Sequence, residues 1–338
     1  MPLVSKALKS LGIKEIVIHT GQHYDKNMSC LFFEELGLRK PDYNLRVKNG
    51  PSYLQLADML FGLGRVLAKE RPSLVLLYGD TNSTLAGAIA AVKAGIRIAH
   101  IEAGLRSFNA DMPEEINRVL TDSVSSIFFC PTRTALNNLK KEGKIKNAYL
   151  VGDVMFDSIK YFSSKLKKPA TRGRYILCTV HRAENTDDPC RLTEIFYALG
   201  KAGEKVVMPL HPRTAKYIKK YRIGIESNIE ITLPASYFEM LSLERNADII
   251  VTDSGGVQKE AYIFGIPCVT LRNETEWVET VSRGNNFLAG ADSGKILAML
   301  RKAAGIKRNR AASKFYGDGF AHNRIARIIN KSLMNDEN

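Results

Sequence analysis

Short apolar runs alternate with longer amphipathic stretches along most of this chain, a pattern typical of parallel α/β proteins. In the first half, aliphatic and β-branched runs predict strands at residues 15–20, 73–78, 97–101 and 126–130. The stretches around them predict helices at residues 26–36, 53–69, 81–93, 114–125 and 132–142. We therefore expect a doubly wound α/β domain over residues 1–165.

A basic, proline-containing stretch at residues 164–174 indicates a linker, and a second alternation follows it. Strands are predicted at residues 175–180, 205–210, 229–232, 247–252 and 267–271, and helices at 191–202, 213–221, 237–245 and 257–264. We expect a second domain of the same class over residues 173–315 and an amphipathic helix within residues 316–338. Two domains also suit the length, because 338 residues exceed what one hydrophobic core usually serves.

The beginning of the chain departs from this pattern. Residues 2–11 have the periodicity of the end of a helix, whereas a doubly wound domain opens with a strand and a phosphate-facing turn. We therefore expect the first domain to lack its opening strand.

Composition narrows the class of protein. No apolar run approaches the roughly 20 residues that span a bilayer, and no signal peptide is visible. The five cysteines are scattered without a CxxC pair, which favours a reducing cytoplasm and argues against disulfides or a zinc site. The net charge of +14 weakly supports an anionic ligand. The basic segments lack the interleaved aromatic residues that are typical of nucleic-acid binders.

Candidate chemistry gathers after predicted strands, where open α/β sheets bind ligands. The sequence Asp253-Ser254-Gly255-Gly256 follows a buried-type strand and begins a helix, so its amides could bind an anion. Glu260 lies one turn further on and could accept hydrogen bonds from ribose hydroxyls. The alternative is an ordinary N-cap with a glycine turn.

Three carboxylates mark the first domain. Asp80 follows one strand and Glu102 ends the next, so they should be close if these strands are neighbours, which suits acid–base chemistry. Glu114 opens a helix, where it could equally be a dipole-favoured residue or a surface partner of Arg118. Asp80 could be only an N-cap, and His100 is more consistent with a structural role.

In the second domain, histidine and arginine follow two strands. His181 and Arg182 come after the first, and His211 and Arg213 after the next. A histidine beside an arginine is a reasonable partner for a phosphate or a leaving group.

These motifs together resemble the non-hydrolysing UDP-N-acetylglucosamine 2-epimerase family over nearly the whole chain. The resemblance rests on Gly79-Asp80-Thr81, on His100 to Arg106, on Met112 to Arg118, on His181 to Asn185, on Asp253 to Glu260 and on Tyr316 to Gly319. It implies two Rossmann-like domains facing a cleft, the GT-B arrangement, with a C-terminal helix that returns to the first domain. It also implies a homodimer and no metal or redox cofactor.

The family inverts C2 of a UDP-sugar by eliminating UDP to a glycal and adding it back. By resemblance, Asp80, Glu102 and Glu114 are the acid, base and stabilising carboxylates, and His181 serves the departing UDP. The resemblance also suggests which residues contact UDP or substrate: Arg182, His211, Arg213, Ser254, Gly255, Gly256 and Glu260.

The family's opening strand and its Gly-Thr-Arg-Pro-Glu turn have no counterpart here. The family's allosteric site is not expected here, because Asp25 and residues 49–52 do not match its pattern. UDP-GlcNAc is the first candidate substrate, with UDP-ManNAc as product. The alternative is UDP-2,3-diacetamido-2,3-dideoxyglucuronate, since residues 275–279 read Thr-Glu-Trp-Val-Glu rather than Thr-Glu-Arg-Pro-Glu. A hydrolysing epimerase, a glycosyltransferase and a non-catalytic UDP-sugar binding protein also remain possible.

Overall fold

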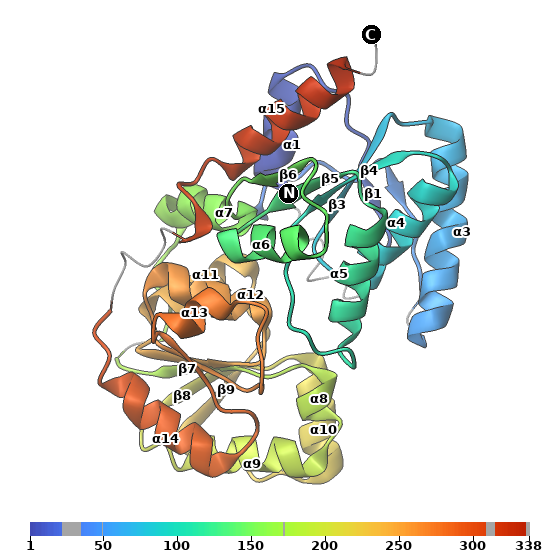
Figure 1. Ribbon diagram of the computed structural model, residues 1–338. Helices are drawn as coiled ribbons and strands as arrows, with labels where there is room; N and C mark the ends of the chain where they lie inside the picture. The colour runs from blue at the N-terminus through green and yellow to red at the C-terminus, as the bar shows by residue number, and fades with distance from the viewer. Residues whose placement is uncertain (22–34, 49, 172, 309–314, 336–338) are drawn as a thin grey trace. The chain divides into compact units, whose positions relative to one another are not determined.

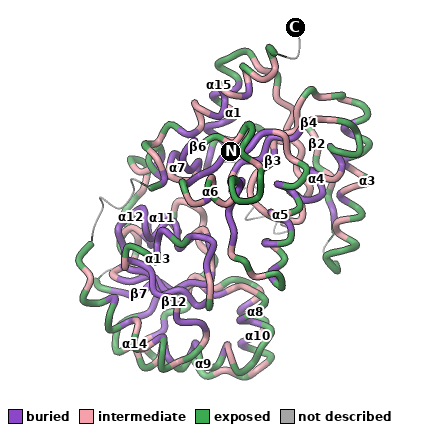
Figure 2. Tube along the Cα trace, in the orientation of Figure 1, coloured by how far each residue is buried: buried purple, intermediate pink, exposed green. Residues whose placement is uncertain are grey.

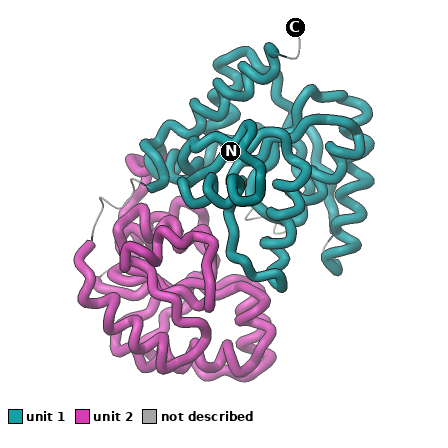
Figure 3. Tube along the Cα trace, viewed as in Figure 1, with its two compact units in different colours: residues 1–161, 315–338 teal, residues 162–314 magenta. Residues whose placement is uncertain are grey.

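The computed structural model describes residues 1–21, 35–48, 50–171, 173–308 and 315–335. The chain divides into two compact units (Figure 3). Unit 1 comprises Met1–Tyr161 with Phe315–Asn338, and unit 2 comprises Phe162–Lys314. The C-terminal segment therefore belongs to the same unit as the N-terminus.

Unit 1 contains a four-stranded parallel sheet in the order β3 (Leu74–Tyr78), β4 (Arg97–Ile101), β5 (Ile127–Cys130), β6 (Ala148–Leu150). Its helices are α3 (Ser52–Glu70), α4 (Asn82–Lys93), α5 (Pro113–Val124), α6 (Arg133–Lys141) and α7 (Val154–Phe162). The strands predicted at residues 73–78, 97–101 and 126–130 agree within one residue with β3, β4 and β5, because buried parallel strands are recognisable as continuous apolar runs. Strand β6 was not predicted; it is short and largely exposed.

The two ends of the chain pack together within unit 1 (Figure 1). Helix α1 (Pro2–Ser10) lies against α15 (Ala321–Met334). Val4 and Leu8 of α1, with Ile325 and Ile329 of α15, join one hydrophobic cluster with residues of β4 and β5. Spacing of three or four residues places these side chains on one helix face, which explains the docking of α15.

A second, small sheet in unit 1 pairs β1 (Ile18–His19) with β2 (Tyr43–Asn44) in parallel. The strand predicted at residues 15–20 is thus only two residues long. In the described part of the chain, neither β1 nor β2 pairs with β3, although Ile18 packs against the same cluster as Val75 and Leu77. The helix predicted at residues 26–36 lies almost wholly outside the described residues.

Unit 2 is a six-stranded parallel sheet in the order β12-β11-β10-β7-β8-β9. The strands are β7 (Ile176–Thr179), β8 (Val206–Pro209), β9 (Ile229–Thr232), β10 (Ile249–Thr252), β11 (Cys268–Thr270) and β12 (Asn286–Leu288). The helices are α8 (Ala183–Thr186), α9 (Pro189–Gly200), α10 (Pro212–Tyr221), α11 (Tyr237–Asn246), α12 (Gly255–Phe264), α13 (Val278–Ser282) and α14 (Ser293–Ala304).

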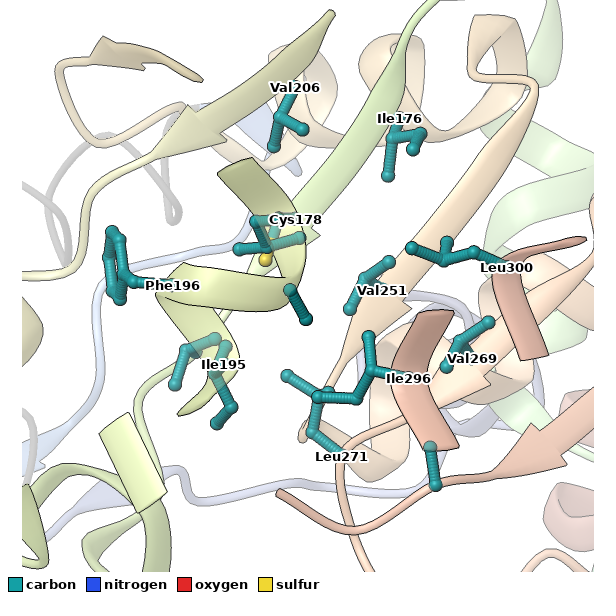
Figure 4. Close-up of a cluster of buried hydrophobic side chains, with 14 of the residues drawn as sticks. Ile176, Cys178, Ile195, Phe196, Val206, Val251, Val269, Leu271, Ile296 and Leu300 are labelled. Carbon is teal, nitrogen blue, oxygen red and sulfur yellow. The ribbon is translucent and has the colours of Figure 1, made fainter. Parts of the chain in front are cut away.

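Both faces of the unit 2 sheet are covered (Figures 2 and 4). Ile176, Cys178 and Val251 point into a cluster with helices α9 and α14, which Figure 4 shows. Leu177 and Ile250, the intervening residues, join a second cluster with residues of α12. The strands are accordingly buried throughout the sheet centre in Figure 2. This two-sided burial leaves the carboxyl ends of the strands as the places where polar side chains can gather.

No helix among the described residues is long and apolar enough to cross a membrane.

Candidate functional site

In unit 1, the turn after β3 fixes Asp80. The amide of Gly79 donates to the Ile101 carbonyl of β4 at 3.0 Å, and the Asn117 side-chain amide donates to the Asp80 carbonyl at 2.9 Å. The N-cap of α4 is Thr81. Asp80 is therefore not that helix's N-cap, and its carboxylate is available for another task.

A buried arginine holds that carboxylate. Arg118 of α5 is only 1% exposed and donates to Asp80 Oδ2 from Nε at 3.1 Å and from Nη2 at 2.5 Å. Its Nη1 donates to Glu115 at 2.6 Å. The interpretation of Arg118 as a surface partner is therefore wrong: it is the buried counter-ion of Asp80. Sequence analysis missed this because helical spacing alone does not tell a buried face from an exposed one.

The backbone of Glu102 has a left-handed conformation that residues other than glycine rarely adopt. Its φ is +71°, and its amide donates to the Phe129 carbonyl of β5 at 3.2 Å. A left-handed conformation costs on the order of 1 kcal/mol for such a residue, and strain of this kind concentrates at functional sites. Strands β3 and β4 are paired neighbours, with Tyr78 opposite Ile101. Asp80 and Glu102 therefore follow the ends of two adjacent strands.

Glu114 and Glu115 divide two roles at the start of α5. Glu115 is buried and accepts hydrogen bonds from the amides of Ser107 and Phe108, at 2.8 and 3.1 Å, as well as from Arg118. Glu114, the residue that the motif singled out, is partly exposed in the first turn. Glu115 thus anchors the preceding loop while Glu114 stays accessible.

In unit 2, a buried carboxylate ties two strand-end turns together. Asp253 follows β10 and is fully buried, and it accepts hydrogen bonds from the amides of His181 and Arg182 and from the Asn185 side chain, at 3.0–3.1 Å. All three donors follow β7, the neighbouring strand. Asp253 therefore shapes the turn rather than facing a ligand, a function that sequence analysis did not foresee.

Ser254, not Asp253, caps helix α12. Its hydroxyl accepts a hydrogen bond from the Val257 amide at 3.4 Å. The helix begins at Gly255, so the amides of Gly255 and Gly256 occupy its first turn, where amides have no partner within a helix. A Cβ on Gly255 would meet the Glu276 carboxylate and lie 3.2 Å from Trp277 Nε1, which explains the glycine. The arrangement can bind an anion.

His181 and His211 lie side by side, with ring centroids 5.4 Å apart. His211 is the N-cap of α10, and its Nδ1 accepts from the Arg213 amide at 3.1 Å, so Nδ1 carries no proton. The Nδ1 of His181 lies 3.4 Å from the Asp253 carboxylate, which favours the tautomer with its proton on Nδ1.

The two arginines predicted to bind UDP differ in their contacts. Arg213 donates from Nη2 to Asp187 at 2.6 Å and from Nε to Thr186 at 2.8 Å. Although burial opposes it, Arg213 keeps the pKa of Asp187 below its usual value. Arg182, whose amide reaches Asp253, is partly exposed just before α8.

Glu260 is buried in α12, and Glu244 of α11 is fully buried nearby. Burial first, and then the charge of Glu260 and a hydrogen bond to it, raise the pKa of Glu244 well above the ordinary value. The folded protein therefore favours a proton on Glu244, whose pKa the charge of Glu260 also raises. No motif in the sequence pointed to Glu244.

Among the described residues, no group of three or more His, Cys, Asp or Glu side chains could hold a metal ion.

Comparisons with known proteins identify the class. The family described as UDP-N-acetylglucosamine 2-epimerase matches residues 6–330. The chain is 50% identical to a UDP-2,3-diacetamido-2,3-dideoxy-D-glucuronate 2-epimerase of Pseudomonas aeruginosa, covering 97% of this chain and 95% of the relative. It is 43% identical to a UDP-N-acetylglucosamine 2-epimerase of Methanococcus maripaludis, covering 96% and 94%.

The fold matches as well. The crystal structure of the Methanocaldococcus jannaschii UDP-GlcNAc 2-epimerase in complex with UDP-GlcNAc and UDP superposes with a TM-score of 0.89 at 39% identity. The match covers 98% of this chain and 95% of that structure. Parallel α/β units of this kind, together with these relatives, define an isomerase that acts on UDP-sugars. The chain belongs to the UDP-N-acetylglucosamine 2-epimerase family.

Proposed function

We propose that the chain inverts C2 of UDP-2,3-diacetamido-2,3-dideoxyglucuronate. The observation that carries this choice is the 50% identity to an epimerase of that sugar, against 43% to a UDP-GlcNAc epimerase at similar coverage. The comparison reverses the order in which the motifs alone ranked the two sugars. The Trp277 segment, which the motifs already associated with the diacetamido sugar, supports the same choice.

The proposed reaction eliminates UDP and then adds it back. A base removes the C2 proton as the C1–O bond breaks, UDP departs with the bonding electrons, and a glycal remains. A proton then returns to the opposite face of C2 while UDP re-forms its bond to C1. Positive charge developing on the sugar ring is stabilised by nearby carboxylates.

Unit 1 carries the groups suited to that proton transfer. Asp80 is held as an anion by Arg118, Glu102 sits on a strained strand end, and Glu114 stays accessible at the start of α5. We assign these three carboxylates to the roles of general acid, general base and stabiliser of the sugar ring. Proton-exchange measurements on single variants will establish which residue has which role.

Unit 2 carries the groups suited to UDP. The first turn of α12 offers the amides of Gly255 and Gly256 to a diphosphate, and Glu260 is assigned to the ribose. His181, through Nε2, is assigned to the departing phosphate, with Arg182, His211 and Arg213 as neighbours that bind or orient it. A retained UDP is what allows re-addition in place of release.

The substrate assignment is tested by incubating the protein with each sugar in D2O. We expect deuterium at C2 of both epimers and a kcat/KM at least about 10-fold higher for the diacetamidoglucuronate than for UDP-GlcNAc. A preference for UDP-GlcNAc would return that sugar to first place, as the 39% identical UDP-GlcNAc-bound structure suggests. Absence of exchange with both sugars would remove the epimerase assignment.

The same assay distinguishes the epimerase from three different activities. Free sugar accumulating with UDP indicates a hydrolysing epimerase. Tight UDP binding without exchange indicates a non-catalytic binding protein, and sugar transfer to an added acceptor indicates a glycosyltransferase.

The exposed apolar side chains of α3 and α5 support a homodimer. Helix α4 packs against both helices, so the three form one layer. The exposed side chains are Tyr53, Leu54 and Phe61 on α3, and Ile116, Leu120 and Val124 on α5. On α5 the spacing of four residues places Ile116, Leu120 and Val124 along one stripe, and an exposed apolar stripe marks an interaction site. A second copy would bury the same stripe symmetrically.

Sedimentation tests this pairing. Phe61→Arg with Leu120→Arg should convert a dimer to a monomer at micromolar concentration. Tyr197→Arg, which changes an exposed aromatic residue of unit 2, is the matched control. A wild-type monomer would contradict the proposal.

We also propose that the described residues leave the place of an inner strand between β1 and β3 unfilled. The separation of unit 1 into two sheets, with Ile18 and Leu77 in one hydrophobic cluster, supports it. A synthetic apolar peptide that pairs there should protect the amides of β1 and β3 from hydrogen exchange and leave β6 unchanged.

A further inference from the structure

His100 occupies an unusual position in unit 1. It lies in β4, is completely buried, and both of its ring nitrogens are within hydrogen-bond distance of an oxygen. Nε2 is 2.8 Å from the carbonyl of Gly79, and Nδ1 is 2.7 Å from Asp122 Oδ1 on α5. Neither the acid–base assignment nor the UDP assignment makes use of this histidine.

The identities of these partners determine where the protons are. A backbone carbonyl can only accept, so Nε2 must carry a hydrogen. The proton between Nδ1 and Asp122 could in principle reside on either group. Asp122 Oδ2, however, already accepts from Arg106 Nη1 at 2.8 Å and from the Gly104 amide at 3.0 Å, and both contacts favour an ionised carboxylate. Both nitrogens of His100 therefore donate, which makes the ring an imidazolium.

The surrounding charges agree with this protonation state. The ionisable groups around the pair are Asp80 after β3, Cys130 of β5 and Arg106 after β4. Burial alone would lower the pKa of His100, but the hydrogen bond and charge of Asp122 raise it above its ordinary value. Burial would raise the pKa of Asp122, but His100 and Arg106 lower it. Burial raises the pKa of Cys130 to about 12, so its thiol is neutral.

The charges continue in an alternating line to the surface. Arg106 also binds Glu142 of the segment after α6 through two parallel hydrogen bonds of 2.7 and 2.8 Å. Glu142 in turn pairs with Lys144 at 3.1 Å. Paired in this way, the buried histidine cation does not carry an uncompensated charge.

This line holds both strand-end turns that carry the candidate carboxylates. His100 is hydrogen-bonded to the carbonyl of Gly79, the residue before Asp80. Gly79 has a φ of +65°, in the left-handed region. Asp122 accepts a hydrogen bond from the amide of Gly104, which lies two residues after the strained Glu102. The imidazolium thus connects β3, β4 and α5 at the base of both turns.

We propose that His100 is a permanently protonated positioning residue, whose imidazolium clamps Gly79 and Asp122 and thereby fixes the direction of the Asp80 carboxylate. The role of Asp80 in this statement rests on the proposed function. The protonation state of His100 does not, because it follows from contacts within unit 1 alone.

Protonation is measured by two-bond proton–nitrogen correlation spectra of protein labelled with nitrogen-15 histidine. The chain has six histidines, and the His100 signals are those that His100→Gln removes. We expect both ring nitrogens of His100 to remain protonated at pH 8, where an ordinary histidine, with a pKa of about 6.5, is neutral. A neutral ring at pH 8 overturns the proposal.

Positioning is measured by kinetics. His100→Gln should lower kcat on the order of 100-fold with KM changed less than about 3-fold, because misplacement affects the reacting groups more than UDP binding. His322→Gln is the matched control, since His322 also pairs with a buried aspartate, Asp157, at 2.6 Å but lies in α15. It should retain wild-type kcat.

Asp122→Asn supplies a second variant in case His100→Gln fails to fold. It removes the charge that raises the pKa of His100, so kcat of the variant should fall as the pH rises from 6 to 8, while that of the wild type does not fall for this reason. A wild-type kcat in folded His100→Gln, or a pH profile of Asp122→Asn that matches the wild type, overturns the positioning role. Failure of the proposed function shows separately, as a wild-type protein that exchanges deuterium into neither sugar while its His100 spectrum remains interpretable.

Discussion

The strand ends of the two units use opposite charges to the same purpose. In unit 1 the groups available for chemistry are carboxylates, and buried cations hold them: Arg118 binds Asp80, and His100 and Arg106 support the turns behind it. In unit 2 the groups available for binding are backbone amides at the start of α12, and the buried anion Asp253 holds the neighbouring turn. Each unit compensates the charges that it buries, with partners of opposite charge or with hydrogen-bond donors.

This difference separates proton chemistry from anion binding. A carboxylate beside a diphosphate would repel it, and burying Asp253 beneath three donors removes that repulsion. Cations beside Asp80 keep that group ionised and able to act as a base or to stabilise positive charge. Changes to the unit 1 carboxylates should therefore affect kcat, and changes to Asp253 or to the α12 turn should affect UDP affinity or stability.

Asp80→Asn should have the largest effect. The substitution keeps the shape of the side chain but removes the charge that Arg118 pairs with, and loss of an acid–base group typically costs 10²–10⁴-fold in rate, so we expect kcat to fall about 10³-fold. UDP affinity, measured by calorimetry, should change less than about 2-fold. Asp58→Asn, at an exposed position of α3, is the control. A large loss of UDP affinity would show that the division between the units is incorrect.

Asp253→Ala tests the opposite region. It leaves the amides of His181 and Arg182 and the Asn185 side chain without their buried acceptor, so the free energy of unfolding should fall by about 3 kcal/mol. UDP affinity should fall more than about 10-fold, because the turn before α12 loses the hydrogen bonds that join it to the turn after β7. Denaturant titration with UDP calorimetry measures both. Ser254→Ala, which removes the hydroxyl that caps α12, should cost about 1 kcal/mol of stability. Equal losses in the two variants would argue against a bracing role for Asp253.

The parts that sequence analysis predicted well are those encoded locally. Strands such as β4 and β10 are buried on both faces, so their apolar runs are continuous, and a polar group at the end of such a run is easy to recognise. Asp80, Glu102 and the glycine turn of α12 were found in this way. The prediction made strand β1 too long, because its aliphatic run begins at Ile16, two residues before the first residue that pairs.

The parts that sequence analysis missed depend on partners distant in the chain. Asp253 is bound by residues about 70 positions earlier, and Arg118 pairs with Asp80 across 38 positions. Neither pairing leaves a local pattern. For the same reason, Glu244 could be recognised as a buried acid only in the structure. The packing of α11 on α12 brings Glu260 near it.

Gly255→Ala sharpens the description of the binding turn. The added Cβ would collide with the Glu276 carboxylate and lie 3.2 Å from Trp277 Nε1, so either the Glu276 side chain or the turn must shift. We expect UDP affinity to fall about 10-fold, with kcat at saturating substrate changed less. Gly64→Ala is the matched control, because a Cβ on that helical glycine would meet nothing within 4 Å. An unchanged UDP affinity would exclude Gly255 from the site.

Glu244→Gln should change stability least at low pH, and the sign of its effect at higher pH is diagnostic. The pKa of Glu244 is raised in the folded protein from an ordinary value of 4.5, so the folded state binds this proton more tightly than the unfolded chain does. The stabilisation from that proton is complete below pH 4.5 and is lost as the pH rises toward the folded-state pKa. Glutamine keeps the donor to Glu260 and does not titrate.

The stability of Glu244→Gln relative to the wild type should therefore increase with pH, by at most about 1.4 kcal/mol for each pH unit in that range. Urea titrations at pH 5, 6, 7 and 8 measure the difference, with Glu204→Gln as an exposed control. A difference that is independent of pH would mean that Glu244 is ionised in the folded protein. Unit 2 would then bury an unshared carboxylate beside Glu260, contrary to the rule by which each unit compensates the charge that it buries.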